Sequence, residues 1–163
     1  MARKAFFSFY YAGDLWRAQA VASSWATQPD RQVAGLWEPA VWRDAKRQGD
    51  AAVRRLIDEA MEDTTVTVVL IGRKAANSPW VRYEIEKTLQ ASKGLVGVYI
   101  HGVPDSSGRA DTQGSNPFDL FHFVEEGEKV SLSQYYNIYD WVSDQGQDNI
   151  DAWIERAAQD AGV

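Results

Sequence analysis

The stretch "TTVTVVLIGRKAANSPWVRYEIEKTLQ", Thr64 to Gln90, decides the fold. Its first residues are mostly β-branched and end at Gly72, which is typical of a buried central strand. Ser78 followed by Pro79 marks a helix start, because a serine caps the first turn and a proline needs no amide partner there. An apolar stripe at helical spacing follows, formed by Val81, Ile85 and Leu89. The stretch predicts a strand, a loop and a helix.

The same alternation runs outward in both directions. Strands are predicted at 5–11, briefly within 33–42, and at 94–100; helices are predicted after a cap at Asp14, after a cap at Asp50, and at 150–161. Residues 118–141 fit a hairpin or a peripheral strand, with a turn at Glu126 and Gly127. Strands separated by helices imply parallel strands joined by right-handed crossovers. We therefore predict an α/β, flavodoxin-like fold of three layers, with a central, mostly parallel sheet and helices on both faces.

Bulk composition limits the class of protein. A chain of 163 residues with 45% hydrophobic residues is long enough for one core, so residues 1–163 are expected to form a single domain. The net charge of -6 argues against nucleic acid and against anionic membranes as partners. With no cysteine, thiolate nucleophiles and thiolate metal sites are excluded. A signal peptide and a membrane span are not apparent, so a cytoplasmic location is expected.

Familiar catalytic motifs are missing. The sequence has no GxxxxGK, GxGxxG, HExxH or GxSxG, and His101 and His122 have no metal-ligand spacing, so no metal site is predicted. The segment 101–116, rich in Gly, Ser, Asp and Pro, is either a functional loop or mobile.

What remains is a carboxylate among aromatic residues. Glu84 lies in the second turn of the predicted helix, one turn after Trp80 and just beyond the carboxyl end of a strand, where open α/β sheets bind ligands. A carboxylate there suits glycosidic chemistry, because it stabilises the positive charge that develops on a sugar ring or binds the ribose diol. A nicotinamide leaving group is already cationic and needs no general acid. Helical spacing alone equally allows a solvated, structural glutamate.

Three stretches carry a family resemblance: "AFFSFYYAGD" (5–14), "LIDEAMEDTTVTVVLIG" (56–72) and "NSPWVRYEIEKTLQ" (77–90). They resemble the Toll/interleukin receptor (TIR) pattern of a first strand ending in Phe-x-Ser, a helix leading into a hydrophobic strand, and Ser-x-Trp-Cys-x-x-Glu. The stretches "LWEPAVWRDAKRQGD" (36–50), "VLIGRKAANSPWVRYEIEK" (69–87) and "SNPFD" (115–119) are more closely similar to the TIR-like proteins of the bacterial Thoeris antiphage system. Two thirds of the chain is covered.

The resemblance implies an NAD+ glycohydrolase or ADP-ribosyl cyclase. NAD+ would be the substrate, with no further cofactor, and Glu84 would match the catalytic glutamate. An ADP-ribose-type signal, linear or cyclic, would diffuse to a separate effector after a phage-derived trigger, and self-association is a further possibility. The chain departs from the pattern at Val81, where many TIR domains carry Cys, and at Gly72, where many carry Ser.

Seven further residues are candidates for substrate binding: Phe7, Ser8, Tyr10, Trp37, Trp42, Lys46 and Trp80. Each has an ordinary structural alternative. The aromatic side chains are equally suited to a core or to a stacking platform, Ser8 to a turn cap, and Lys46 to a solvated charge rather than a pyrophosphate contact.

Two other functions stay open. In the first, the fold is a non-catalytic TIR-type assembly module and Glu84 is structural. In the second, the chain acts on deoxynucleosides, because nucleoside deoxyribosyltransferases also use a glutamate on a similar sheet. A solvent-filled cleft at Glu84 would favour an enzyme, and a closed, apolar environment would favour the module.

Overall fold

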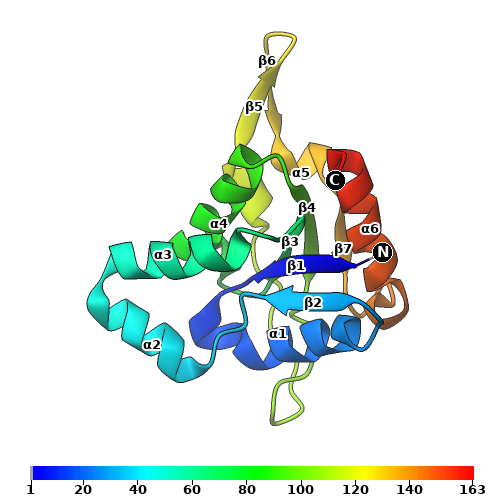
Figure 1. Cartoon of the computed structure of the whole chain (residues 1–163). Helices are drawn as coiled ribbons and strands as arrows, with labels where there is room; N and C mark the ends of the chain where they lie inside the picture. The colour runs from blue at the N-terminus through cyan, green and yellow to red at the C-terminus, as the bar shows by residue number, and fades with distance from the viewer. Residues whose placement is uncertain (1) are drawn as a thin grey trace.

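Five parallel strands form the central sheet of the computed structural model, which describes residues 2–163 (Figure 1). In sheet order they are β2 (Arg31–Ala34), β1 (Arg3–Ser8), β3 (Val66–Ile71), β4 (Gly94–Tyr99) and β7 (Ile138–Asp140). All four neighbouring pairs are parallel. All six residues of β3 are buried, as its β-branched sequence predicts.

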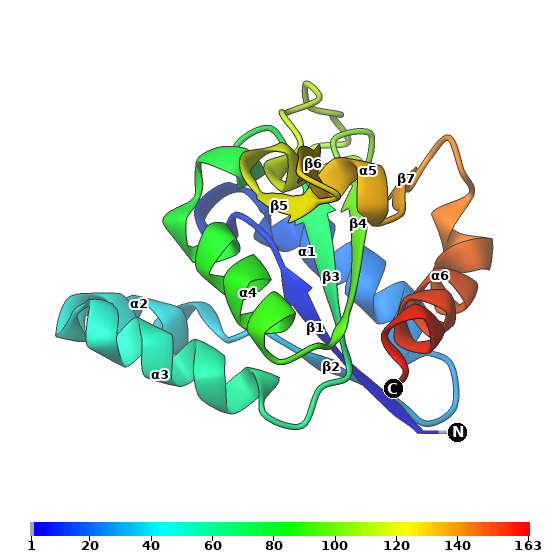
Figure 2. The same ribbon diagram turned by 90° about the horizontal axis from the view of Figure 1, so that it is seen from above.

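Helices cover both faces of this sheet (Figure 2). α1 (Tyr11–Ala26) and α6 (Gly146–Ala161) pack on one face, in a core that contains Phe7 and Val68. On the other side lie α2 (Pro39–Gln48), α3 (Asp50–Met61) and α4 (Pro79–Gln90); α4 packs on Val69 and Ile71. The predicted three-layer, flavodoxin-like α/β fold is therefore confirmed.

The strand order places a topological switch between β1 and β3. From β1 the chain moves outward to β2 on one side, and then returns to β3 on the other. Ser8, the last residue of β1, lies in register with Val69 of β3. Crevices at such switch points are where open α/β sheets bind ligands. The fold therefore directs attention to the carboxyl ends of these two strands.

Residues 117–140 contain both structures that the sequence favours there. After η2 (Pro117–Leu120), β5 (His122–Glu125) and β6 (Glu128–Ser131) form an antiparallel hairpin that projects from the body (Figure 1). The turn lies at Glu126 and Gly127, both with positive φ, as predicted. After α5 (Leu132–Tyr135), β7 completes the main sheet.

Helix α2 and the start of α1 differ from the prediction. Residues 33–42 were interpreted as a brief strand, interrupted at Gly35 and Pro39, that runs into a loop; Pro39 instead occupies the first turn of α2, where proline is tolerated. Val41, Trp42 and Ala45 give α2 one apolar side, but the rest of this short helix is polar and only Ala45 is buried. α1 begins at Tyr11, three residues before the predicted cap, and Asp14 is a buried residue inside its first turn.

Arg17 of α1 holds the segment 101–116 by hydrogen bonds and ion pairs. This guanidinium donates from Nε to the carbonyl of Val103 at 2.7 Å and from Nη2 to the carbonyl of Arg109 at 3.0 Å. Its Nη atoms also lie within 4.0 Å of carboxylate oxygens of Asp105 and Asp111. The segment thus has a defined set of contacts with the body. Within residues 2–163, no helix is long and apolar enough to cross a membrane.

Candidate functional site

Glu84 is buried at the carboxyl end of β1. Ser78 caps α4 by accepting a hydrogen bond from the amide of Val81 at 3.3 Å, which sets where the helix begins and so where its second turn lies. Only 4% of Glu84 is exposed. The hydroxyl of Ser8 donates to Glu84 Oε1 at 2.8 Å. Two segments that lie 76 residues apart in the sequence therefore meet at one carboxylate.

Burial raises the pKa of Glu84 to about 8, and the hydrogen bond from Ser8 opposes that rise. Burial dominates because a carboxylate loses its hydration when it is enclosed. No salt bridge of Glu84 is found in residues 2–163. A buried acid with a perturbed pKa and no cation beside it is the kind of group that functional sites contain.

A continuous aromatic stack stands next to Glu84. Ring centroids lie 5.6 Å apart for Phe9 and Tyr11, 4.9 Å apart for Tyr11 and Trp42, and 5.4 Å apart for Trp42 and Trp37. The hydroxyl of Tyr11 donates to the backbone carbonyl of Trp37. The stack thus joins the end of β1 to the segment that leads into α2.

The cavity at Glu84 has a volume of about 20 Å³, which suffices for about one water molecule. Its lining consists of Phe7, Phe9, Tyr11, Gly35, Trp37, Trp42, Ser78, Trp80 and Glu84. A Cβ at Gly35 would lie 2.7 Å from the carbonyl oxygen of Phe7, so glycine is what allows the loop after β2 to approach β1. In this conformation the site is narrow, and most of its lining side chains are aromatic.

The structure gathers most, but not all, of the predicted site residues. Those that line the cavity are Phe7, Trp37, Trp42, Trp80 and Glu84. Ser8 reaches the carboxylate itself. Tyr10 is half-buried just before α1 and is not among the lining residues. Lys46 is exposed on α2, with Nζ 5.9 Å from the centroid of the Trp80 ring. Substrate contacts by all of these residues stay predictions.

Four lining residues escaped the sequence analysis: Phe9, Tyr11, Gly35 and Ser78. The aromatic run at 6–11 contained a signal for the first two, because it continues past the end of β1 at Ser8. Ser78 was recognised only as a helix cap, and it also serves as one. Gly35 was interpreted as a strand interruption.

Asp14 is a second buried carboxylate near this edge of the sheet. It is 4% exposed, and its Oδ2 has no hydrogen-bond partner within residues 2–163. Burial raises its pKa to about 6, while Arg17, with Nη1 3.9 Å from Oδ1, opposes the rise. A Cβ at Gly72 would lie 2.1 Å from Asp14 Oδ2. The glycine that departs from the TIR pattern therefore makes room for this carboxylate.

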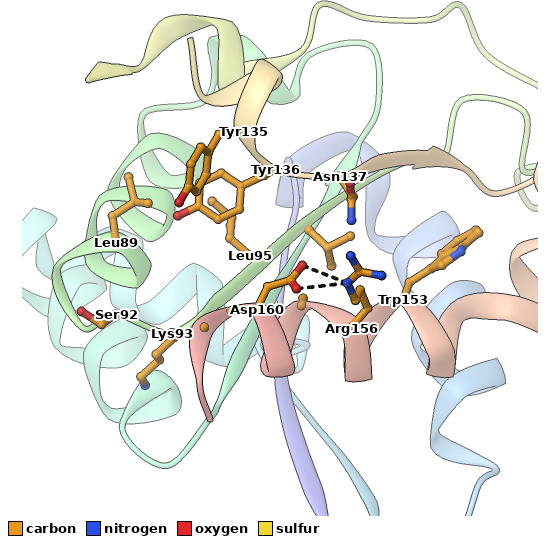
Figure 3. Close-up of a pocket in the computed structure, with 14 residues that line it drawn as sticks. Leu89, Ser92, Lys93, Leu95, Tyr135, Tyr136, Asn137, Trp153, Arg156 and Asp160 are labelled. Carbon is orange, nitrogen blue, oxygen red and sulfur yellow. Dashed lines mark hydrogen bonds and ion pairs between the residues drawn. The ribbon is translucent and has the colours of Figure 1, made fainter. Parts of the chain in front are cut away.

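A much larger cavity lies at the other end of the strands (Figure 3). It measures about 570 Å³ and is bounded by the start of β4, the ends of α4 and α5, and α6. The rings of Tyr135 and Tyr136 face it from one side; on the other, Arg156 Nε donates to Asp160 Oδ1 at 3.0 Å (Figure 3). It shares no lining residue with the pocket at Glu84. Within residues 2–163, no cluster of side chains suits a metal ion.

The five-stranded parallel sheet and the buried glutamate on α4 agree with the fold and the glutamate position that the TIR resemblance implies. Residues 6–105 match the family described as Thoeris protein ThsB, TIR-like domain. The chain is also 30% identical, over 191 aligned positions, to the putative cyclic ADP-D-ribose synthase ThsB1 of Bacillus cereus (strain MSX-D12). That alignment covers 94% of this chain and 100% of the relative. The chain belongs to the Thoeris ThsB TIR-like family.

Proposed function

We propose that this protein cleaves NAD+ at the bond between nicotinamide and ribose and forms an ADP-ribose-type signal, cyclic as in the name of its Bacillus cereus relative. The observation that carries the proposal is the buried carboxylate of Glu84, held by Ser8 beside an aromatic stack at the switch point of the sheet. Burying a carboxylate without a cation beside it lowers the stability of the fold, and a purely structural role would not offset that loss.

Glu84 would act through its charge. As nicotinamide leaves, the bond from C1′ of the ribose to the ring nitrogen breaks, the electron pair goes to the nitrogen, and positive charge develops on the ribose. A fixed carboxylate stabilises this charge, and low polarity around it strengthens the attraction. The group must be ionised for this role. No general acid is needed, because the leaving nicotinamide takes no proton.

The aromatic stack would decide what reacts with C1′. Attack by water gives linear ADP-ribose, whereas attack by a nitrogen or oxygen of the same molecule gives a cyclic product; either attack releases one proton. Cyclisation therefore requires that water is kept from the charged ribose. Tyr11, Trp37 and Trp42 form a wall of stacked rings in the lining of the pocket.

Substrate entry requires the pocket to open, since about 20 Å³ cannot hold a nicotinamide ring. The segment that bears Trp37 and Trp42 lies between Gly35 and Gly49, whose φ angles are 96° and 108°. Ala45 is the one buried residue of α2, so an outward movement mainly separates Trp42 from Tyr11. In the proposed cycle the segment moves outward to admit NAD+ and closes over it.

The remaining features of the proposal concern the cell. The product would diffuse to a separate antiphage effector, a phage-derived trigger would start synthesis, and self-association is compatible with both. We place the reaction in the cytoplasm, where NAD+ is available, with neither a metal ion nor a further cofactor taking part.

A non-catalytic assembly module is the second candidate, and one observation favours it. Glu84 is buried beside a narrow pocket lined mostly by aromatic side chains, which is an environment expected of a structural glutamate. The raised pKa of Glu84 argues against the module, because an uncharged residue such as Gln would fill the same space with a smaller loss of stability. The enzyme is therefore our conclusion.

Mass spectrometry of nucleotides tests the proposal. Cells that express the wild type or Glu84→Gln are compared with and without phage challenge. We expect NAD+ to fall and an ADP-ribose-type species to rise in the wild type alone. Unchanged nucleotides in both, with infection verified independently, would reject the enzyme in favour of the module. Turnover of deoxynucleosides without loss of NAD+ would instead select a deoxyribosyltransferase-like enzyme.

A further inference from the structure

Three hydroxyl groups lie in the apolar layer between the sheet and α4. Ser8 of β1, Thr67 of β3 and Thr88 of α4 are each 0% exposed. Thr67 belongs to a buried strand whose residues Val69 and Ile71 pack under α4, and Thr88 follows Ile85 by one turn. Apolar side chains would suit these positions. Buried polar groups need partners, and here they find them in one another and in Glu84.

The hydroxyls hold Glu84 at two points. Ser8 donates to its carboxylate at 2.8 Å, and Thr88 Oγ1 donates to its backbone carbonyl at 2.7 Å. Thr67 Oγ1 lies 2.6 Å from Thr88 Oγ1. Because a hydroxyl has one proton, and that of Thr88 goes to Glu84, Thr67 must be the donor in this pair. A directed chain therefore runs from the central strand through Thr88 to the backbone of Glu84.

We propose that Thr67 and Thr88 are positioning residues, which fix the backbone of α4 at Glu84 against β3 while Ser8 fixes the carboxylate. The proposal rests on the proposed function and deepens it. A carboxylate that stabilises charge only at one place on the substrate depends on sub-ångström placement. Ser8 of β1 holds the side chain of Glu84, and Thr67 of β3 holds its backbone through Thr88. The position of the carboxylate is therefore fixed relative to both strands at the switch point.

The ordinary alternative is that these threonines serve the fold alone. Thr64 provides a matched control, because it is also a buried threonine near β3, 4% exposed, with Oγ1 donating to the carbonyl of Met61 at 2.7 Å. It takes part in no hydrogen bond with the chain that leads to Glu84. Replacing Thr by Val removes the hydroxyl and preserves the shape in all three cases.

The experiment compares Thr88→Val, Thr67→Val, their double variant and Thr64→Val, with Thr67→Ser and Thr88→Ser as rescue variants. Protein is purified from phage-challenged cells, and kcat and KM for NAD+ are measured together with the melting temperature. We expect kcat to fall roughly tenfold in Thr88→Val and by about threefold in Thr67→Val, below the roughly hundredfold cost of a 1 Å misplacement. The KM for NAD+ should stay unchanged, and Thr67→Ser and Thr88→Ser should keep the kcat of the wild type.

The double variant tests whether the two residues form one chain. If Thr67 acts through Thr88, then Thr67→Val lowers kcat no further once Thr88 is Val. Full additivity of the two effects, or a loss of kcat in Thr64→Val equal to that in Thr88→Val at the same loss of stability, overturns the proposal. So does a kcat in Thr88→Val within a factor of two of the wild type.

A second readout separates this proposal from the proposed function. The 13C shift of the Glu84 carboxyl is followed against pH in the wild type and in Ser8→Ala, Thr88→Val and Thr64→Val. We expect the midpoint of the Glu84 titration to rise in Ser8→Ala, because the hydrogen bond that favours the ionised form is lost. The midpoint should also shift in Thr88→Val, and it should stay unchanged in Thr64→Val. These shifts without any turnover of NAD+ by the wild type would reject the enzyme and keep the positioning contacts as a feature of the fold. Identical midpoints in Thr88→Val and Thr64→Val would reject the positioning itself.

Discussion

The pocket at Glu84 and the large cavity beside α6 lie at opposite ends of the sheet strands. The first measures about 20 Å³ and encloses a carboxylate that no cation neutralises; the second measures about 570 Å³, and its carboxylate, Asp160, is exposed and paired with Arg156. On volume alone, the cavity beside α6 would be chosen as the candidate active site. Chemistry selects the first, because the electrostatic effect of a charge is largest where water is excluded.

The largest expected effect comes from removing the charge in the pocket. Glu84→Gln preserves the size of the side chain and should lower the rate of NAD+ cleavage by at least about a thousandfold, since the amide cannot stabilise a cationic ribose. Product formation in challenged cells, measured by mass spectrometry, checks this.

Asp160→Asn is the matched control at the other end of the sheet. The same change of carboxylate to amide at an exposed site should leave the rate within about twofold. A comparable loss of rate in Glu84→Gln and Asp160→Asn would contradict the assignment of the chemistry to the pocket at Glu84.

Two arginines extend the comparison to stability. Arg17, 6% exposed, holds two carbonyls of the segment 101–116 and faces three carboxylates, including Asp14. Arg17→Ala should lower the free energy of unfolding by about 3–5 kcal/mol, because it leaves buried groups unpaired. Arg156→Ala, in an exposed pair, should cost at most about 1 kcal/mol. Urea unfolding measures both, and equal losses would contradict the assignment of Arg17 as the anchor of the segment.

Trp42 tests the aromatic stack. Trp42→Ala opens the wall beside Tyr11 and should lower the ratio of cyclic to linear product about tenfold, because water gains access to the charged ribose. Chromatography of the products measures the ratio. Tyr135→Ala, which removes a ring from the large cavity, is the control and should leave the ratio unchanged.

The stability of the protein should also depend on pH. The pKa of Glu84 is about 8 in the folded protein and near its ordinary value of 4.5 in the unfolded chain, so the folded state keeps its proton to higher pH. Stability therefore falls as pH rises from about 4.5 to about 8, whereas kcat/KM should rise through about pH 8 as the carboxylate ionises. Glu84→Gln should be more stable than the wild type by about 4 kcal/mol at pH 8, with a difference that shrinks towards pH 5. A difference independent of pH would show that Glu84 is ionised throughout.

The sequence predicted those elements whose signals are local. The β-branched run of β3 and the Ser78–Pro79 cap of α4 are confirmed within two residues, since burial and capping leave marks on neighbouring positions. α2 was missed because Pro39 was interpreted as an interruption, and the apolar side of this ten-residue helix is confined to Val41, Trp42 and Ala45. Asp14 was mistaken for a cap because α1 begins three residues earlier and because Gly72, which makes room for the carboxylate, is brought beside it only by packing.

By itself, the sequence indicated the α/β class, the family and the glutamate that the proposed chemistry uses, because each of these depends on residue types at short spacing. Only the tertiary structure decided the surroundings of that glutamate. Ser8 reaches Glu84 across 76 residues, Tyr11 reaches Trp37 across 26, and Thr67 reaches Thr88 across 21. Such contacts follow from strand order and helix packing, which bring distant segments together, and the same packing buries Glu84 and so raises its pKa.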